Sequence, residues 1–162
     1  MTKKTYNLTV DDFSPLLVYD PPVQQAPLGA ETYAFPSSPS SWNCSFTASS
    51  WQKWNVFTVG GGSSYHTGPK GAKVSVTWEG TGITINGQRG LWNDDPAPNG
   101  EATLTVDGKA GSCGYPDSGD EYYIQCSLQG LDSGKHTAVL TVTSGHVAIG
   151  EVQFTSDFIS DL

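Results

Sequence analysis

The sequence predicts an all-β fold, an antiparallel sandwich of two sheets, in a single domain that spans residues 1–162. Apolar and polar residues alternate with a period of two in one segment after another, and glycine-rich turns separate these segments. No long stretch shows the i, i+3, i+4, i+7 spacing of an amphipathic helix. A strand with one apolar and one polar face buries the apolar face against a second layer, which favours the sandwich.

The expected strands follow one another in chain order. A strand opens the chain, a short one is expected at 17–19, and the turn 79–82 joins two strands at 72–79 and 83–88. Later strands follow, and the last of them, at 147–158, shows weaker alternation. The apolar positions of the clear strands are Tyr6, Leu8 and Val10; Ala72, Val74, Val76 and Trp78; Ile83 and Ile85; Ala102, Leu104 and Val106; Tyr122, Ile124, Cys126 and Leu128; and Ala138, Leu140 and Val142.

The segment 13–55 differs in composition from the rest of the chain. It holds most of the ten prolines, together with two serine pairs, and this predicts a Pro/Ser-rich insertion near 20–50 that runs over the surface. Long loops in compact domains are usually functional or disordered. Trp42, Trp51 and Trp54 argue against disorder here.

The charge balance excludes several classes of function. Asp and Glu number 16 against 8 Lys and Arg, the net charge is −8, and Arg89 is the single arginine. Such a chain lacks the basic surface that nucleic-acid binding needs, and anionic membranes repel it. No apolar run approaches the roughly 20 residues of a membrane span. We therefore expect neither a nucleic-acid partner nor membrane insertion.

Cysteines and glycosylation sequons bear on the compartment. The start of the sequence shows no signal-peptide pattern, so the chain is either cytosolic or a mature domain. Sequons at Asn7 and Asn43, low charge and abundant Ser, Thr and Gly favour a secreted protein. Cys113 and Cys126 flank an expected loop and are candidates for a disulfide; the alternative is three reduced, half-buried thiols.

Five motifs in order resemble the galactose-binding-domain-like β-sandwich of carbohydrate-binding modules and of extracellular fungal proteins. They are Val10-Asp11-Asp12 with Val18-Tyr19, Tyr65-His66-Thr67, Gly80-Thr81-Gly82-Ile83-Thr84-Ile85-Asn86-Gly87, Leu104-Thr105-Val106-Asp107-Gly108 and Leu131-Asp132-Ser133-Gly134-Lys135-His136-Thr137. The resemblance implies a jelly roll that binds sugars through loops at one end and, in some members, holds a structural calcium. It also implies that Asp11 and Asp12 tie the opening strand to the next segment.

The loop 89–100 is the first candidate binding site. Within seven residues it gathers an indole, which lies well against the C–H faces of a sugar ring, and polar groups that hydrogen-bond hydroxyls. The alternative is a tryptophan folded over the edge of the core, with Asp and Asn as turn formers. The candidate ligand-binding residues of this loop are Arg89, Trp92, Asn93, Asp94 and Asp95.

Strand direction predicts which loops share an end of the sandwich. If neighbouring strands alternate, loop 90–99, the approach 65–70 and the turn 130–134 lie at one end, and loop 109–120 lies at the other. Tyr65 and His66 are therefore further binding candidates, although His66 also fits a structural histidine.

Two further groups of residues, one aromatic and one acidic, each allow two interpretations. Trp51 and Trp54 form either an aromatic platform for a polysaccharide or a plug that closes the sandwich. Asp117, Asp120 and Glu121 are weak calcium candidates, and the alternative is a solvated acidic loop without EF-hand spacing. No other cofactor is expected.

These features lead to three hypotheses of function. The first is non-catalytic carbohydrate binding, as in a lectin or carbohydrate-binding module, with a glycan as partner. The second is a structural or adhesive extracellular domain. The third is a glycan-active hydrolase or lyase, which needs two facing carboxylates; Asp94, Asp95, Glu101 and Glu151 are available, and no G-x-S-x-G motif exists.

Overall fold

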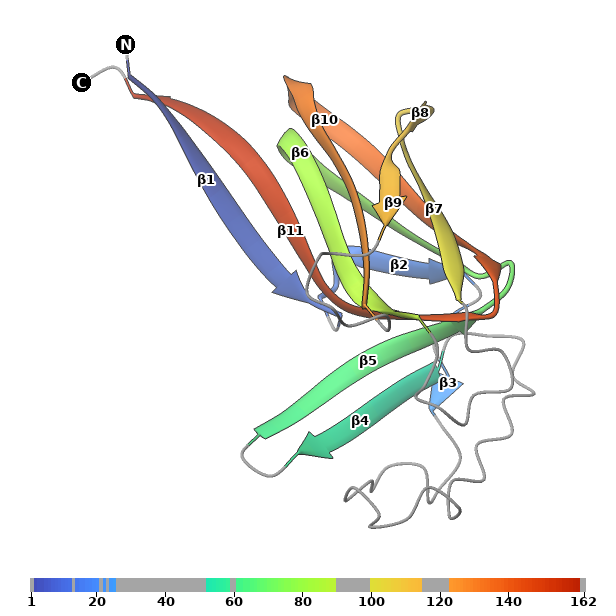
Figure 1. The fold of residues 1–162 in the computed structure, drawn as a ribbon. Helices are drawn as coiled ribbons and strands as arrows, with labels where there is room; N and C mark the ends of the chain where they lie inside the picture. Colours follow the sequence, from blue (N-terminus) through green and yellow to red (C-terminus); the bar gives the residue numbers. More distant parts are fainter. Residues whose placement is uncertain are drawn as a thin grey trace, which may run out of the picture.

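A computed structural model describes residues 2–12, 14–20, 22, 24–25, 52–58, 61–89, 100–114 and 123–160. Throughout these ranges the regular structure is β, and all strands join in one hydrogen-bonded sheet of eleven strands (Figure 1). The predicted all-β class is thus confirmed. The described ranges also contain no helix that is long and apolar enough to cross a membrane.

All strand pairs are antiparallel except β3 with β4, which is parallel. The strands are β1 (Thr2–Asp11), β2 (Leu17–Asp20), β3 (Gln24–Gln25), β4 (Gln52–Thr58), β5 (Gly61–Pro69), β6 (Lys73–Arg89), β7 (Glu101–Val106), β8 (Lys109–Ala110), β9 (Ser112–Gly114), β10 (Tyr123–Ser144) and β11 (His146–Ser160).

Two long strands, β6 and β10, double the sheet over on itself. The first half of β6 pairs with the second half of β10, as in Val76↔Ala138, and its second half pairs with the first half of β10, as in Ile85↔Cys126. Figure 1 shows both strands turning back at the same place, so that the two halves of the sheet face each other. The two layers of the sandwich are therefore halves of one continuous sheet.

Glycines mark the fold line. Gly80 and Gly82 of β6 pair with Gly134 and Gln129 of β10, so β10 carries the extra residues 130–133 where β6 carries Thr81. A Cβ at Gly80 would lie 2.3 Å from the backbone oxygen of Thr155, which only glycine avoids. The expected hairpin at 79–82 is instead a bend inside one strand, and the pairing with β10 continues on both sides of the register shift between Gln129 and Gly134.

The core lies between the two halves. Trp78 on the first half of β6 stacks on Phe154 of β11, with ring centroids 5.7 Å apart, which links the layers directly. Ile83, Leu104, Leu140 and Ile149 are almost fully buried. A buried side chain of this size contributes roughly 1.5–3 kcal/mol, so the alternating apolar positions hold the layers together.

The opening strand departs from the expected pattern. Tyr6 and Leu8 share the apolar parity of β1, yet they are 53% and 60% exposed. β1 pairs with β11 over its whole length, and the two strands extend as an arm beyond the doubled part of the sheet (Figure 1). The second layer does not reach these residues, so alternation alone overestimated the core.

The Asp-Asp motif ties the opening strand to the next segment, as the resemblance implied. Asp12 is 1% exposed, its backbone N–H donates to Gly150, and its backbone carbonyl accepts the Tyr19 hydroxyl at 2.8 Å. Burial, reinforced by the Asp12 and Asp11 carboxylates, raises the pKa of Tyr19 far above its usual value. Tyr19 therefore stays a hydrogen-bond donor.

Candidate functional site

The structure describes only some of the predicted binding residues. Arg89 ends β6, Tyr65 and His66 lie in β5, and Trp54 lies in β4. The remaining candidates lie outside the described residues. They are Trp51, Trp92, Asn93, Asp94 and Asp95, the calcium candidates Asp117, Asp120 and Glu121, and the sequon residue Asn43.

The strand register brings β5 to the end of β6. Val147 of β11 pairs with both Gly68 and Arg89, and Ile149 pairs with both His66 and Gly87. The approach 65–70 therefore lies at the end of the sheet where segment 90–99 leaves β6. Trp54 stands directly opposite Tyr65 in the β4–β5 ladder, so two features that the sequence suggested separately are neighbours along the backbone.

The expected positions of two other segments were wrong. Segment 115–122 begins after Gly114, whose neighbour Cys113 pairs with Cys126, and ends at Tyr123, which pairs with Gln88. Gly114 and Tyr123, the described residues that flank the segment, therefore lie beside the end of β6, whereas the turn 130–134 lies at the fold line, at the other end. The reversal arises because β8 and β9 were missed: strands of two and three residues are too short to show alternation.

Arg89 and Gly100, the residues that flank segment 90–99, are joined by a hydrogen bond. The Nε of Arg89 donates to the backbone oxygen of Gly100 at 2.8 Å. A Cβ at Gly100 would lie 1.8 Å from the backbone oxygen of His146, so the chain enters β7 in close contact with the start of β11. The lone arginine thus has a structural contact in addition to its predicted role.

A row of polar side chains crosses three strands on the outer face near this end. Gln125 of β10 donates from Nε2 to Asn86 Oδ1 of β6 at 2.9 Å, and Asn86 donates from Nδ2 to Glu151 Oε1 of β11 at 3.0 Å. The register puts the three residues in line, and we name Gln125, Asn86 and Glu151 the amide row. Each bond uses one N–H of an amide, so each amide retains a second N–H for another acceptor.

An exposed aromatic residue borders the amide row. Tyr123 is 40% exposed and has the same strand parity as Gln125, two positions along β10. Sequence reasoning missed this group, although a signal was present: Tyr123 is an aromatic residue on the polar face of its strand. An exposed ring beside fixed amides and a carboxylate presents the apolar and polar contacts that a sugar requires.

A cavity of about 200 Å³ lies on the inner side of β10, opposite the face that carries Tyr123. Its lining combines a carboxylate and hydroxyls with apolar groups, and none of the described lining residues is aromatic. The lining residues are Glu101, Ala102 and Thr103 of β7, Cys113 and Gly114 of β9, and Ile124 and Thr143 of β10. It therefore lacks the stacking surface that Tyr123 provides on the outer face.

The predicted disulfide is present. Cys113 and Cys126 stand opposite each other in the β9–β10 ladder and are joined by a disulfide. The bond attaches the three-residue strand β9 to the body of the sheet.

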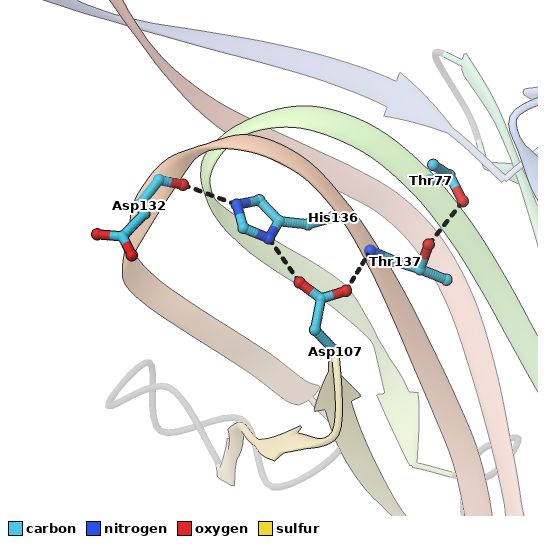
Figure 2. A network of polar contacts seen from close by, with 5 residues as sticks. All are labelled: Thr77, Asp107, Asp132, His136 and Thr137. Atoms are coloured by element: carbon cyan, nitrogen blue, oxygen red, sulfur yellow. Dashed lines mark hydrogen bonds and ion pairs between the residues drawn. The ribbon is translucent and has the colours of Figure 1, made fainter.

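A second polar network lies at the opposite end, where two of the sequence motifs meet (Figure 2). Asp107 lies in the two-residue turn between β7 and β8 with φ of 49°, which an Asp-Gly turn accommodates. Its Oδ2 lies 2.6 Å from Nδ1 of His136, and its Oδ1 accepts the backbone N–H of Thr137 at 2.9 Å. The other ring nitrogen, Nε2, lies 2.8 Å from the backbone oxygen of Asp132.

The contacts of His136 favour its protonated form. A carboxylate and a backbone carbonyl only accept hydrogen bonds, so each ring nitrogen finds an acceptor when both carry protons. The hydrogen bond to Asp107 is the main cause that raises the pKa of His136, and the same bond lowers the pKa of Asp107. The protonated ring has no lone pair for a general base, and both of its nitrogens contact neighbouring segments, so we interpret this Asp–His pair as structural.

The network predicts a stability maximum in the mildly acidic range. Because folding raises the pKa of His136, protonated His136 stabilises the fold fully below pH 6.5, its ordinary pKa. This stabilisation is lost as pH rises through the pKa of the folded state. Because folding lowers the pKa of Asp107, the Asp107 carboxylate stabilises the fold fully above pH 3.8, its ordinary pKa. This stabilisation is lost as pH falls through the pKa of the folded state. We expect Asp107→Asn, which keeps the turn, to lower the melting temperature by about 1–3 °C at pH 5 to 6 and by less above pH 8, since solvent screens this exposed pair. A melting-temperature difference that does not vary with pH would contradict this account.

The described residues give no support for a metal centre. No group of three or more His, Cys, Asp or Glu side chains in these ranges could hold a metal ion. The calcium candidates lie in segment 115–122 and stay a prediction.

Comparison with known proteins identifies a fold neighbour but no family. No family model matches the chain, and no curated protein matches it. Among solved structures, a family two carbohydrate esterase from Cellvibrio japonicus superposes with a TM-score of 0.50 at 13% identity, over 96% of this chain and 36% of that one. The Agl-KA catalytic domain gives a TM-score of 0.38 at 12% identity, over 57% of this chain and 21% of the other. The chain thus spans about a third of the esterase, and the likeness shows the fold.

Proposed function

We propose that the chain binds glycans without catalysis, on the outer face formed by β6, β10 and β11. The observation that carries the proposal is the exposed Tyr123 ring beside the hydrogen-bonded amide row of Gln125, Asn86 and Glu151. The ring offers an apolar surface for a sugar face, while the row offers donors and acceptors for hydroxyl groups.

The rigidity of the row favours binding. Gln125 and Glu151 both bond Asn86, which orients the three polar groups before a ligand arrives. Preorganised groups lose little conformational entropy on binding. Because adjacent strands lie about 4.8 Å apart, the row spans roughly 10 Å, which suits a short stretch of glycan.

Charge narrows the ligand class. The chain has a net charge of −8, and the amide row itself ends in Glu151. An acidic surface disfavours uronic acid-rich or sulfated polymers, so we propose neutral glycans as partners. A disulfide also suits an oxidising compartment, which supports the proposal that the protein is secreted.

The binding site predicts a clear mutational effect. We expect Tyr123→Ala to weaken binding of a neutral oligosaccharide about tenfold, and Gln125→Ala to weaken it severalfold, because each removes a direct contact. The measurement is isothermal titration with the neutral oligosaccharide that gives the strongest signal on a glycan array. Tyr6→Ala is the matched control, because Tyr6 is 53% exposed but lies on the β1 arm, away from the row. Equal binding by Tyr123→Ala and the unsubstituted protein would refute this site.

Two other functions give different outcomes in the same experiments. The fold neighbour is by name a carbohydrate esterase, so incubation with acetylated and unsubstituted polysaccharides tests for catalysis. Release of acetate, reducing ends or unsaturated products would establish an enzyme in place of a binding domain. Absence of binding across the array, with and without calcium, would favour a structural or adhesive domain.

A further inference from the structure

β1 is an edge strand of the sheet that the described residues form. β1 is ten residues long, pairs with β11, and has no described strand on its other edge. A long edge strand presents backbone donors and acceptors that favour pairing with another chain, and proteins usually shield such edges. On this arm Tyr6 and Leu8 are 53% and 60% exposed, which adds apolar surface at the edge.

Charge is distributed asymmetrically along β1. Lys3 and Lys4 lie at the start of the strand. Asp11 lies at its end and stands opposite a second acidic residue, Glu151, in the β1–β11 ladder. Two copies of such a strand repel each other in a parallel arrangement, because like charges meet. An antiparallel arrangement brings the basic start of one copy to the acidic end of the other.

One antiparallel register satisfies both the charges and the apolar residues. With Asn7 on the two-fold axis, Tyr6 stands opposite Leu8 of the second copy, and Lys3 stands opposite Asp11 of the second copy. Both pairings occur twice by symmetry, as an isologous interface requires.

We propose that β1 pairs with β1 of a second copy in this register and joins two sheets into one across a two-fold axis. Each copy covers the exposed Tyr6 and Leu8 of the other. A glycan on the Asn7 sequon would crowd the axis, so the association belongs to protein that is unglycosylated at Asn7.

Charge reversal tests the register. Sedimentation of unglycosylated protein should show reversible dimers, and Lys3→Asp or Asp11→Lys should each weaken dimerisation at least about tenfold, because each places like charges opposite one another. A mixture of these two single variants should recover dimers, since each mutated end then meets its opposite charge. Monomers at every concentration of the unsubstituted protein, or no recovery in the mixture, would overturn the proposal.

Cross-linking gives a readout that does not depend on the strength of association. In a Cys44→Ser background, Asn7→Cys should form an intermolecular disulfide, because residue 7 faces itself across the axis. Thr9→Cys is the matched control: it also removes the sequon, but the substituted positions of the two copies are offset by four residues, roughly 13 Å along the strands. Equal cross-linking by the two variants would refute this register, and melting curves verify that both variants fold.

Discussion

Replacing Cys113 and Cys126 together by alanine is expected to lower the free energy of unfolding by about 3 kcal/mol. The disulfide closes a loop with a sequence separation of 13, and cross-linking a loop of this length removes about that much entropy from the unfolded chain. Cys126 is 1% exposed, so its loss also removes packing in the core. The cost should be large because β9 has three residues and the bond is its covalent attachment to β10.

Chemical denaturation of the oxidised protein and of the double variant measures this effect. Cys44→Ala is the control for the loss of a cysteine outside the bond. The double variant should also show faster hydrogen exchange at β9 than at β7, because β9 loses its attachment and β7 does not. Equal unfolding free energies of the double variant and the unsubstituted protein would show that the bond contributes nothing to stability.

Gly87→Ala is expected to destabilise the fold by about 1–3 kcal/mol, the usual cost of overpacking a filled site. A Cβ at residue 87 would lie 2.0 Å from the backbone oxygen of Ala148. Backbone cannot move aside as a flexible side chain can, and the register of β6 with β11 already shifts between Ile149 and Glu151. The substitution therefore pushes apart two central strands of the sheet.

Gly114→Ala is the matched control for this prediction. The position is also a strand glycine, but a Cβ there would meet nothing within 4 Å. Thermal unfolding should show a lower melting temperature for Gly87→Ala and little change for Gly114→Ala. If both variants melt alike, the close approach of β6 to Ala148 is not what requires glycine at residue 87.

Much of the sheet could be predicted from local alternation. The inward positions of β6, β7 and β10 were correct because successive side chains on a strand point to opposite faces, whatever the strand's neighbours are. The Cys113–Cys126 pair was also accessible, because both residues flank one loop. Tyr6 and Leu8 were misplaced, because burial depends on how far the second layer extends.

The candidate site was predictable only in part. The sequence predicted that several loops lie at one end of the sandwich. The strand register does place segment 65–70, which contains His66, near the end of β6. The sequence did not reveal the amide row, because Asn86, Gln125 and Glu151 lie far apart in the chain and meet only through the pairing of three strands. Because the sequence did not predict β8 and β9, segments 115–122 and 130–134 were each assigned to the wrong end of the sandwich.

The residue pattern alone predicted the all-β class and the apolar face of most strands, both of which the structure confirms, and it set the excess of acidic over basic residues. These properties follow from composition and from the two-residue period of a strand, which are local. The doubling of one sheet into two layers, the meeting of Asp107 with His136, and the amide row beside Tyr123 depended on long-range pairing. Such contacts are set by the register between strands distant in the chain, and a local period carries no information about which strands become neighbours.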